Sequence, residues 1–342
     1  MTQDMDRIAG MMTGFFQSKA LAAALELRLF DVLDQPATAE HACREAGIPI
    51  RSGRRLLIAL HAMGLIRRVG ATYHLTHSAR SFLVSSSPDW MGWLARHCDT
   101  FLYPLWGKCA DGVRDDRNQR QAVFGDGRSW FEMLYDNPAD IADFQEFLGI
   151  MARPFIDGLL EAFDFTPYRR FLDIGSGSGA LPVAVARRYP GLEIGMCELP
   201  EAAVFARDKM GAPELGGRIR VVVGDVIAGP LPEGRPEDRF DLMHLGWMLH
   251  DYAEETQETI LRNILDSLPP GGTFVASETP LSDDESGPIF TALLSLNMLL
   301  STDGGHESTV AQYLDRFRRV GFTDVHARDI PGPRTLLIGC KP

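Results

Sequence analysis

The chain has 342 residues, of which 45% are hydrophobic and 23% charged, proportions typical of a globular protein long enough for two domains. Its 34 Lys and Arg against 46 Asp and Glu give a formal net charge of −12, so nucleic acid is not expected as a partner. No apolar run reaches about 18 residues, so neither a membrane span nor a membrane partner is expected.

Charge and cysteine usage give two further expectations. Residues 1–100 hold eleven Lys or Arg and nine Asp or Glu, a net charge of +2, which leaves −14 for the rest of the chain. The cysteines are odd in number and form no C-x-x-C pair: Cys43, Cys98, Cys109, Cys197 and Cys340. This usage predicts free thiols in a reducing, cytoplasmic location.

The N-terminal hundred residues predict a small helical domain. Apolar side chains follow helical spacing over residues 5–30, and two shorter helices are expected over 38–46 and 52–63. Two strand-like pieces then surround a Gly-Ala turn within residues 65–75. A helix–turn–helix followed by such a strand pair is the winged-helix pattern.

Three arginines on the second of these helices give the domain two interpretations: Arg51, Arg54 and Arg55. They can contact a DNA backbone, which would make the protein a ligand-sensing, DNA-binding regulator. They can also be solvated residues of a dimerisation module. The acidic balance of the chain favours the second interpretation, so a homodimer is expected.

Residues 90–165 are rich in aromatic residues and predict further helices, some of whose side chains are expected to line a substrate cavity. From residue 170 onward, strand-like and helix-like segments alternate, which predicts a parallel, doubly wound sheet. The expected strands are 170–174, 193–198, 219–224, 240–245, 273–278, 322–328 and 335–340. The last two are expected to form an antiparallel hairpin at the sheet edge, which a dehydrogenase lacks.

The nonapeptide Phe171–Gly179 is the most informative segment, because an apolar run ends in Asp173 and three alternating glycines follow before a helix-like stretch. Glycine accepts positive φ and has no Cβ, so the backbone can turn sharply and approach a ligand closely. A parallel strand that enters a helix through such a turn builds a nucleotide-type site at its carboxyl end. By itself the motif also fits a dinucleotide fingerprint.

Two later landmarks have nucleotide-site spacing. Glu198 closes the second strand, where a carboxylate can accept hydrogen bonds from both hydroxyls of a ribose. Gly224 and Asp225 close the third strand, where a carboxylate can hold an adenine amino group.

The ordered set of motifs resembles the class I S-adenosylmethionine (SAM) dependent methyltransferases. It comprises Leu172–Gly179, Glu198, Gly224–Asp225, Leu268–Gly272 and the terminal hairpin. Four further motifs are similar to the small-molecule O-methyltransferases related to plant caffeic acid O-methyltransferase, and to bacterial members of hydroxyneurosporene and methylthiohydroxybutyrate type. They are Ser18–Phe30, Leu249–Tyr252, Ser277–Pro280 and Gly304–Glu307.

The resemblance implies the cofactor SAM, its product S-adenosyl-L-homocysteine (SAH), and a set of cofactor residues. Gly175 matches the glycine that packs against the methionine moiety, Glu198 the ribose ligand, and Asp225 with Val226 the adenine contacts. The full expected set is Asp173, Gly175, Gly177, Gly179, Glu198, Leu199, Gly224, Asp225, Val226, Gly246, Trp247, Asp251 and Tyr252.

The resemblance also implies a catalytic histidine. His250 matches the family's general base, and Glu278 and Glu307 match the acids that orient its imidazole. A phenol-like hydroxyl has a pKa near ~10, so its deprotonation near pH 7 requires a positioned base, and histidine suits that task. The carboxylate on the far ring nitrogen fixes the tautomer. The expected reaction is therefore O-methylation of a small molecule.

The acceptor is expected to contact residues of the aromatic region and of a later helix: His97, Phe101, Trp106, Met151, Arg153, Asn297 and Met298. Three positions depart from the family. Gly246 and Trp247 stand where the family often has Lys or Arg, Tyr252 replaces a tryptophan, and His306 replaces a more frequent Lys or Arg.

Two other methylation reactions remain open at this stage, beside O-methylation. S-methylation of a thioether hydroxy acid, such as 4-methylthio-2-hydroxybutyrate in dimethylsulfoniopropionate (DMSP) synthesis, needs no base but needs a cation, for which Arg96, His97 or Arg153 are candidates. C-methylation is the third reaction. His250, Asp251 and His306 could form a facial metal site, but the same spacing occurs in metal-free members, so no metal is expected.

The sequence thus predicts an α/β fold: a Rossmann-like class I methyltransferase domain behind an N-terminal all-helical, winged-helix-like dimerisation domain. The expected boundaries are 1–105 for the dimerisation domain, 106–165 for a helical linker that contributes to the substrate pocket, and 166–342 for the SAM-binding domain.

Overall fold

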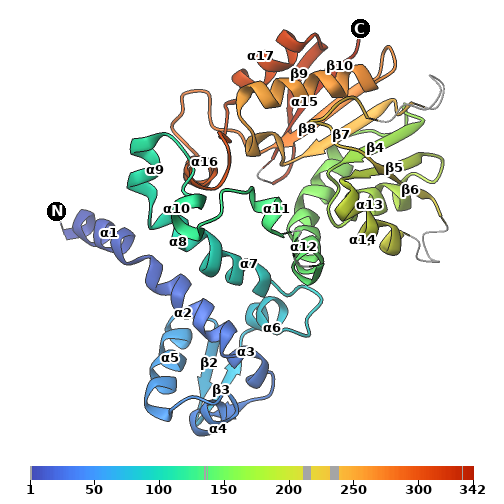
Figure 1. Cartoon of the computed structure of the whole chain (residues 1–342). Coiled ribbons are helices and arrows are strands. Elements are labelled where there is room, and N and C mark those ends of the chain that lie inside the picture. Colours follow the sequence, from blue (N-terminus) through green and yellow to red (C-terminus); the bar gives the residue numbers. More distant parts are fainter. Residues whose placement is uncertain (1, 135, 137, 211–216, 232–238, 333) are drawn as a thin grey trace. The chain divides into compact units, whose positions relative to one another are not determined.

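The structure is a computed structural model that describes residues 2–134, 136, 138–210, 217–231, 239–332 and 334–342. The chain divides into two compact units, Met1–Pro104 and Leu105–Pro342. Figure 1 shows the elements of both.

The N-terminal unit is mainly helical. Its helices are α1 (Thr2–Thr13), α2 (Phe15–Glu26), α3 (Leu29–Val32), α4 (Ala39–Glu45), α5 (Ile50–Ala62), α6 (His77–Leu83) and α7 (Gly92–His97), followed by a π-helical turn, Cys98–Leu102. Thr38 and Thr76 begin α4 and α6, because their hydroxyls accept the backbone N–H of His41 and Ala79.

This unit is not all-helical, since it also holds a small antiparallel sheet in the order β1-β3-β2. The strands are β1 (Ala37–Thr38), β2 (Ile66–Val69) and β3 (Thr72–Leu75). The two expected strand-like pieces correspond to β2 and β3, whereas the two-residue β1 carried no sequence signal. Side chains from α3, α5 and β2 form the unit's apolar core, including Phe30, Leu57 and Ile66.

The C-terminal unit begins with short helices and one long one. They are α9 (Cys109–Asp115), α10 (Arg120–Phe124), α11 (Trp130–Leu134) and α12 (Pro138–Ala162), with α8 (Tyr103–Trp106) at the boundary of the units. Five longer helices follow among the strands: α13 (Ala180–Arg188), α14 (Pro200–Met210), α15 (Glu254–Ser267), α16 (Ile289–Ser301) and α17 (Val310–Val320).

A seven-stranded sheet forms the centre of this unit, in the order β6-β5-β4-β7-β8-β10-β9. Its strands are β4 (Arg170–Ile174), β5 (Glu193–Glu198), β6 (Ile219–Val223), β7 (Leu242–Gly246), β8 (Thr273–Glu278), β9 (Thr323–Asp329) and β10 (Thr335–Cys340). All strands except β10 run parallel. The expected α/β fold, its strands and its terminal hairpin are confirmed, with strand ends within two residues of prediction.

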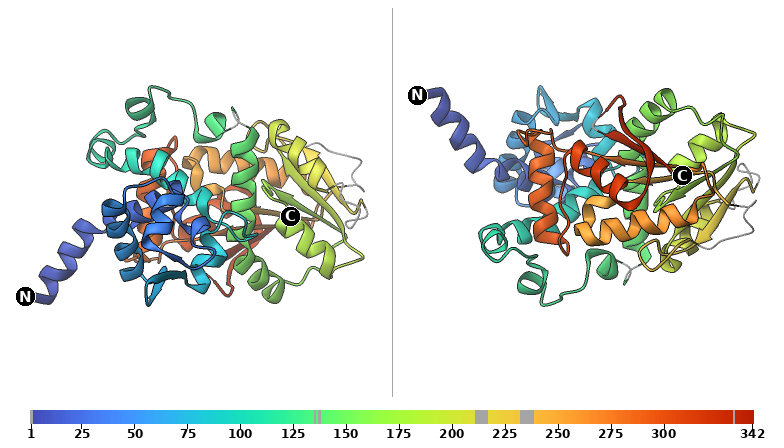
Figure 2. Two further views of the ribbon diagram at one scale, coloured as in Figure 1. Left: turned by 90° about the horizontal axis from the view of Figure 1, so that it is seen from below. Right: turned by 90° about the horizontal axis from the view of Figure 1, so that it is seen from above.

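The sheet is covered on both faces, as a parallel sheet requires. Phe171 and Ile194 pack with α12 and α13 on one face, and Leu172 and Phe274 pack with α15 and α17 on the other. Figure 2 shows these helices around the sheet. Because β4 to β8 run parallel, their carboxyl ends meet at one edge of the sheet, which is where α/β proteins bind ligands.

Two further features bear on the expectations. All five cysteines are free. Among the described residues, no helix combines the length and the apolar character that crossing a membrane demands.

Candidate functional site at the carboxyl edge of the sheet

The glycine loop follows β4 and requires glycine by geometry. Gly175, Gly177 and Gly179 have φ of +64°, +56° and +71°, which side-chain-bearing residues rarely adopt. A Cβ on Gly175 would lie 3.1 Å from the Met248 sulfur, and one on Gly179 would lie 2.7 Å from the Met210 methyl carbon. Glycine at these positions therefore leaves the loop backbone without covering side chains at the carboxyl edge of the sheet.

Three loops at this edge are joined by hydrogen bonds around Glu198. Its Oε1 accepts the N–H of Gly177 at 2.5 Å, and its carbonyl oxygen accepts the N–H of Gly224 at 3.1 Å. Burial raises the pKa of Glu198 to about 8, although the Gly177 N–H has a lowering effect. A buried carboxylate with one backbone donor has room to accept further hydrogen bonds from a ligand.

Asp225 and Val226, which follow β6, differ in their exposure and in their hydrogen bonds. Asp225 is exposed, and its Oδ1 accepts the N–H of Ile227 at 2.8 Å, so the carboxylate closes its own turn. Val226 is buried, and its carbonyl oxygen accepts a hydrogen bond from Asn263. Leu199, which follows Glu198, is partly buried.

These loops fit a nucleoside cofactor. The glycine turn opens α13, whose N-terminus lies at the same edge as the buried acid of β5 and the turn after β6. This is the arrangement in which α/β proteins hold a nucleoside at the end of the first strands. The donor set contains backbone N–H groups and a carboxylate, which suit a ribose.

His250 lies in a 3₁₀ turn, Leu249–Asp251, shortly after β7. Its Nδ1 is 2.5 Å from Oε1 of Glu307, and both side chains are buried, at 4% exposure. Gly305 permits this approach, because a Cβ there would lie 2.6 Å from the His250 carbonyl oxygen. The Gly304–Glu307 motif thus brings its acid to the ring from a segment that begins beyond α16.

Glu278 supports the same turn from the end of β8. Its Oε1 accepts the backbone N–H groups of Met248 and Leu249, at 3.1 Å and 3.0 Å. Glu278 therefore accepts hydrogen bonds from the backbone before His250 and not from the imidazole. Burial raises the pKa of Glu278 to about 7, the charge of His250 opposes this shift, and Glu307 adds to it.

The second ring nitrogen of His250 is open. The nearest described acid is Asp251, whose Oδ1 is 3.7 Å from Nε2, too far for a hydrogen bond. Burial lowers the pKa of His250, but the charges of Asp251, Glu278 and Glu307 and the hydrogen bond that the ring donates to Glu307 raise it overall to about 9. For the neighbouring Asp251 carboxyl, burial raises the pKa.

Trp247 and Gly246 stand at the positions where a Lys or Arg was expected from the family. Trp247 has a φ of +55°, and its ring stacks on His250 with centroids 5.6 Å apart. The guanidinium of Arg334 lies over the same indole, with Cζ 5.0 Å from the ring centroid. A cation therefore reaches this place from the segment before β10.

A second buried histidine pair, missed by the sequence analysis, lies in the sheet beside the glycine loop. His244 Nδ1 is 2.6 Å from Oδ1 of Asp173, and its Nε2 is 3.0 Å from the Ser277 hydroxyl. An ionised aspartate only accepts hydrogen bonds, so His244 donates to Asp173 from Nδ1, and both of its ring nitrogens have a partner. Side chains alternate between the two faces of a strand, so His244 lies on the same face of β7 as the buried Leu242. This alternation is the sequence signal that indicates a buried histidine here.

The expected acceptor residues fall in both units, whose relative placement is not determined. In the C-terminal unit, Trp106 donates its indole N–H to Oδ1 of Asn297 at 3.0 Å, and Met298 is buried. Met151 and Arg153 are exposed on α12.

In the N-terminal unit, the His97 ring stacks between Trp93 and Phe101, at 4.8 Å and 5.2 Å between centroids. Burial lowers the pKa of His97 to about 4, so this imidazole is neutral near pH 7.

The segment considered for a metal is not arranged for one. His306 Nδ1 lies 3.2 Å from the carbonyl oxygen of Gly304, its hydrogen-bond partner among the described residues. Within the described part of the chain, no three His, Cys, Asp or Glu side chains form a group that could hold a metal ion.

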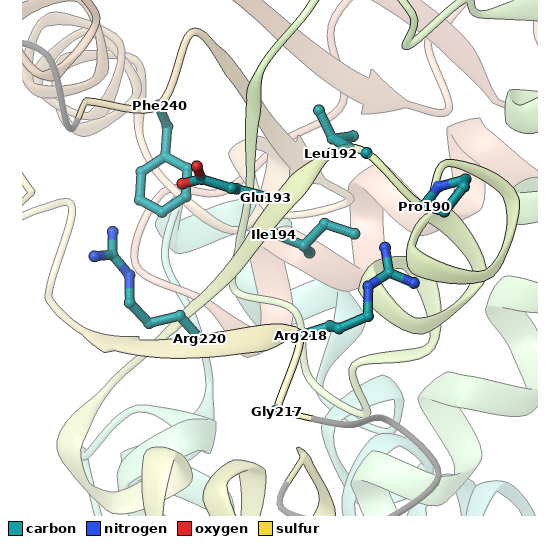
Figure 3. A pocket seen from close by; sticks show the side chains of 9 residues that line it. Pro190, Leu192, Glu193, Ile194, Gly217, Arg218, Arg220 and Phe240 are labelled. Carbon is teal, nitrogen blue, oxygen red and sulfur yellow. The ribbon is translucent and has the colours of Figure 1, made fainter.

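A groove of about 400 Å³ lies at the opposite, amino edge of the sheet, where β5 and β6 begin. Figure 3 shows two arginines among its lining side chains. Arg218 donates to the carbonyl oxygens of Ala186 and Tyr189, and Arg220 lies over the Phe240 ring at 5.0 Å. Arg218 thus has backbone acceptors and Arg220 is exposed to solvent, and the groove lies away from the carboxyl edge.

Comparison with known proteins agrees with this geometry. An O-methyltransferase domain model matches residues 106–323, and an O-methyltransferase dimerisation domain model matches residues 9–85. The S-adenosyl-L-methionine-dependent methyl transferase PigF of Serratia sp. (strain ATCC 39006) is 55% identical over 342 residues, covering 100% of this chain and 97% of PigF. The tetracenomycin polyketide synthesis 8-O-methyl transferase TcmO of Streptomyces glaucescens is 33% identical, with 96% and 94% covered.

Solved structures resemble the whole chain as well. The structure of PigF with SAH has a TM-score of 0.92 at 57% identity and covers 98% of this chain and 99% of PigF. Human N-acetylserotonin methyltransferase in complex with SAM has a TM-score of 0.88 at 28% identity, with 99% and 98% covered.

The fold and its carboxyl edge are those of a class I SAM-dependent methyltransferase. More particularly, the chain belongs to the O-methyltransferase family, and its cofactor is SAM.

Proposed function

We propose that this enzyme methylates a hydroxyl oxygen of an aromatic small molecule, with His250 as the general base. The observation that carries the proposal is the buried His250–Glu307 pair, whose Nδ1 is held at 2.5 Å while Nε2 has no hydrogen-bond partner among the described residues. An imidazole held in this way presents an acceptor nitrogen to a substrate proton. Relatives named as O-methyltransferases agree with this assignment.

The proposed cofactor residues lie on the loops that follow β4, β5, β6 and β7. The glycine turn after Asp173 faces the methionine moiety, Glu198 holds the ribose, and Asp225 with Val226 contacts the adenine. The remaining proposed contacts are Gly175, Gly177, Gly179, Leu199, Gly224, Gly246, Trp247, Asp251 and Tyr252. When bound, SAM supplies an electrophilic methyl carbon on its sulfonium sulfur. Transfer of this methyl group leaves the sulfur as a neutral thioether.

The protein's own residues then align the acceptor and remove its proton. Nε2 of His250 accepts the hydroxyl proton as the oxygen becomes nucleophilic, and Glu307 stabilises the imidazolium that forms. Glu278 fixes the backbone turn that carries the ring, so we assign it a positioning role. Proximity of acceptor and methyl carbon supplies further acceleration.

The protonation state of His250 has to change between the free and the loaded enzyme. With a pKa of about 9, the free imidazole is protonated near pH 7 and cannot act as a base. A positively charged cofactor bound at the same edge disfavours a second cation and lowers this pKa. Loading with SAM therefore favours the neutral ring that the reaction needs.

S-methylation of a thioether hydroxy acid is the alternative reaction. It needs a cation for the substrate carboxylate, and of the three candidates named from the sequence, His97 is neutral near pH 7. Arg153 is exposed on α12. The buried His250–Glu307 pair, which a proton-free thioether does not need, favours oxygen as the methylated atom.

We also propose a homodimer whose partners include no nucleic acid. Large apolar side chains on α1 and α2 are exposed, and the dimerisation-domain match begins within α1. They are Met5, Ile8, Met11, Met12, Phe15 and Phe16. Light scattering is expected to give twice the mass of 37.9 kDa, and a mobility-shift assay with duplex DNA is expected to give no shift at physiological salt.

The decisive test is a mass-spectrometric screen with methyl-labelled SAM against phenols, aromatic polyketides and methylthio hydroxy acids. We expect a labelled methyl group on a hydroxyl oxygen of an aromatic acceptor. Label found on sulfur instead, with phenols inert, would replace O-methylation by the alternative reaction.

A further inference from the structure

Arg334 brings a cation to the carboxyl edge of the sheet from an unexpected direction. It directly precedes β10, whose first residue, Thr335, pairs with Glu278 at the end of β8. The turn between β9 and β10 therefore lies at the same edge as the glycine loop and His250. Arg334 itself is only partly exposed.

Two aromatic rings hold the guanidinium. Its Cζ lies 4.5 Å from the centroid of Phe155 and 5.0 Å from the centroid of Trp247. A cation over a ring face is stabilised by the ring quadrupole, but the contact leaves the N–H donors of the guanidinium without an oxygen acceptor.

Among the described residues, no oxygen atom forms a hydrogen bond or an ion pair with the Arg334 guanidinium, which contacts the two rings. Burial lowers the pKa of Arg334, and the charges of Glu278 and Asp173 oppose this shift without forming an ion pair. The guanidinium is partly exposed, so its donors are accessible to an oxygen acceptor that a ligand brings. A planar carboxylate matches the guanidinium fork best.

The rings around Arg334 connect it to both halves of the site. Phe155 stacks on His244, with centroids 5.8 Å apart, and His244 binds Asp173 directly before the glycine loop. On the other side, Trp247 stacks on His250. Arg334 thus lies between the strand that leads to the cofactor loop and the proposed base.

We propose that Arg334 binds a carboxylate of a molecule held at this edge, either the methionine carboxylate of SAM or a carboxylate of the acceptor. The inference rests on the proposed placement of cofactor and acceptor, but not on which acceptor atom is methylated. It adds a ligand contact from the β9–β10 turn to the loops already described.

Calorimetry on the full-length protein distinguishes the two sources. SAH and 5′-methylthioadenosine share the nucleoside, but only SAH carries the amino acid. If the cofactor is the source, R334M weakens SAH about tenfold or more and leaves 5′-methylthioadenosine within about twofold, because a charge-assisted hydrogen bond is lost from SAH alone. R334K is expected to restore part of the affinity.

If the acceptor is the source, SAH affinity is unchanged in R334M. The variant then weakens 3-hydroxybenzoate, but not its neutral analogue 3-hydroxybenzamide, when each is titrated into the SAH complex. R262M is the matched control, because Arg262 is exposed on α15 and is expected to change none of these affinities.

The inference is overturned if R334M keeps wild-type affinity for SAH and does not discriminate against the benzoate. It is also overturned if the variant weakens SAH and 5′-methylthioadenosine equally while R334K restores neither, since the residue then acts through the fold. Failure of the wild type to bind SAH would instead remove the cofactor assignment itself.

Discussion

Two buried histidine–carboxylate pairs lie in the C-terminal unit, and they differ in what happens at the second ring nitrogen. His244 is bonded on both sides, to Asp173 and to the Ser277 hydroxyl. His250 is bonded only to Glu307, and its Nε2 is left open. A ring with both nitrogens satisfied can only hold structure together, whereas a ring with one free nitrogen can exchange a proton with a substrate.

The difference arises from local backbone geometry. His244 lies inside a regular strand, where neighbouring strands β4 and β8 supply its partners. His250 lies in a short 3₁₀ turn beyond the strand end, and its single acid arrives from the Gly304–Glu307 segment. We therefore propose that the first pair supports the fold and that the second takes part in catalysis.

Replacement of His250 gives the largest expected effect. H250A removes the proposed base, so kcat is expected to fall about 10²–10⁴-fold, measured as single turnovers with SAM saturating. SAH affinity by calorimetry serves as the control for an intact cofactor site. A loss of less than about tenfold would favour an acceptor atom that carries no proton.

Removing the orienting charge gives the next effect. E307Q keeps the shape of the side chain but no longer stabilises the imidazolium, so kcat is expected to fall about 10²-fold or more. KM for the acceptor should change little, because Glu307 contacts the base and not the acceptor. A rise in KM at constant kcat would contradict the assignment.

Glu198 is expected to affect binding and not the chemical step. E198Q replaces one acceptor oxygen by a donor beside the ribose hydroxyls, so SAH affinity should fall about tenfold by calorimetry. E193Q is the matched control, since Glu193 is exposed at the other end of the same strand. Equal affinities of E198Q and E193Q would remove Glu198 from the cofactor site.

His244 gives the smallest effect on turnover. H244L leaves Asp173 without its buried donor, so the free energy of unfolding should fall by about 1–3 kcal/mol, while kcat stays within about threefold. Thermal unfolding and single-turnover rates measure the two quantities on the same samples. A large loss of kcat with unchanged stability would erase the distinction between the two pairs.

The sequence predicted the sheet well because its strands are short, apolar and bounded by glycine or proline turns, as at Gly175 and at Pro331–Gly332. The family resemblance also pointed to the three motifs that meet at His250, which the structure brings together by hydrogen bonds. The two-residue β1 was not predictable, because its pairing with β3 depends on tertiary contact and not on propensity.

The side-chain pairs within the site were harder to foresee. Arg334 and Phe155 are 179 positions apart, and nothing local indicates that they touch. The role of Glu278 depends on which atoms of the turn it reaches, and only the folded backbone shows that these are the N–H groups of Met248 and Leu249. Sequence motifs identify chemical groups, whereas their partners follow from the register of the strands.

The pH dependence of single turnovers tests the catalytic claim most directly. A base must be neutral to act, so with SAM saturating the wild-type rate should rise about tenfold per pH unit and level off at the pKa of His250. The cationic cofactor should bring that pKa below the value of about 9 in the free protein. In H250Q the rise should disappear, and a variant that keeps the wild-type profile would contradict the account.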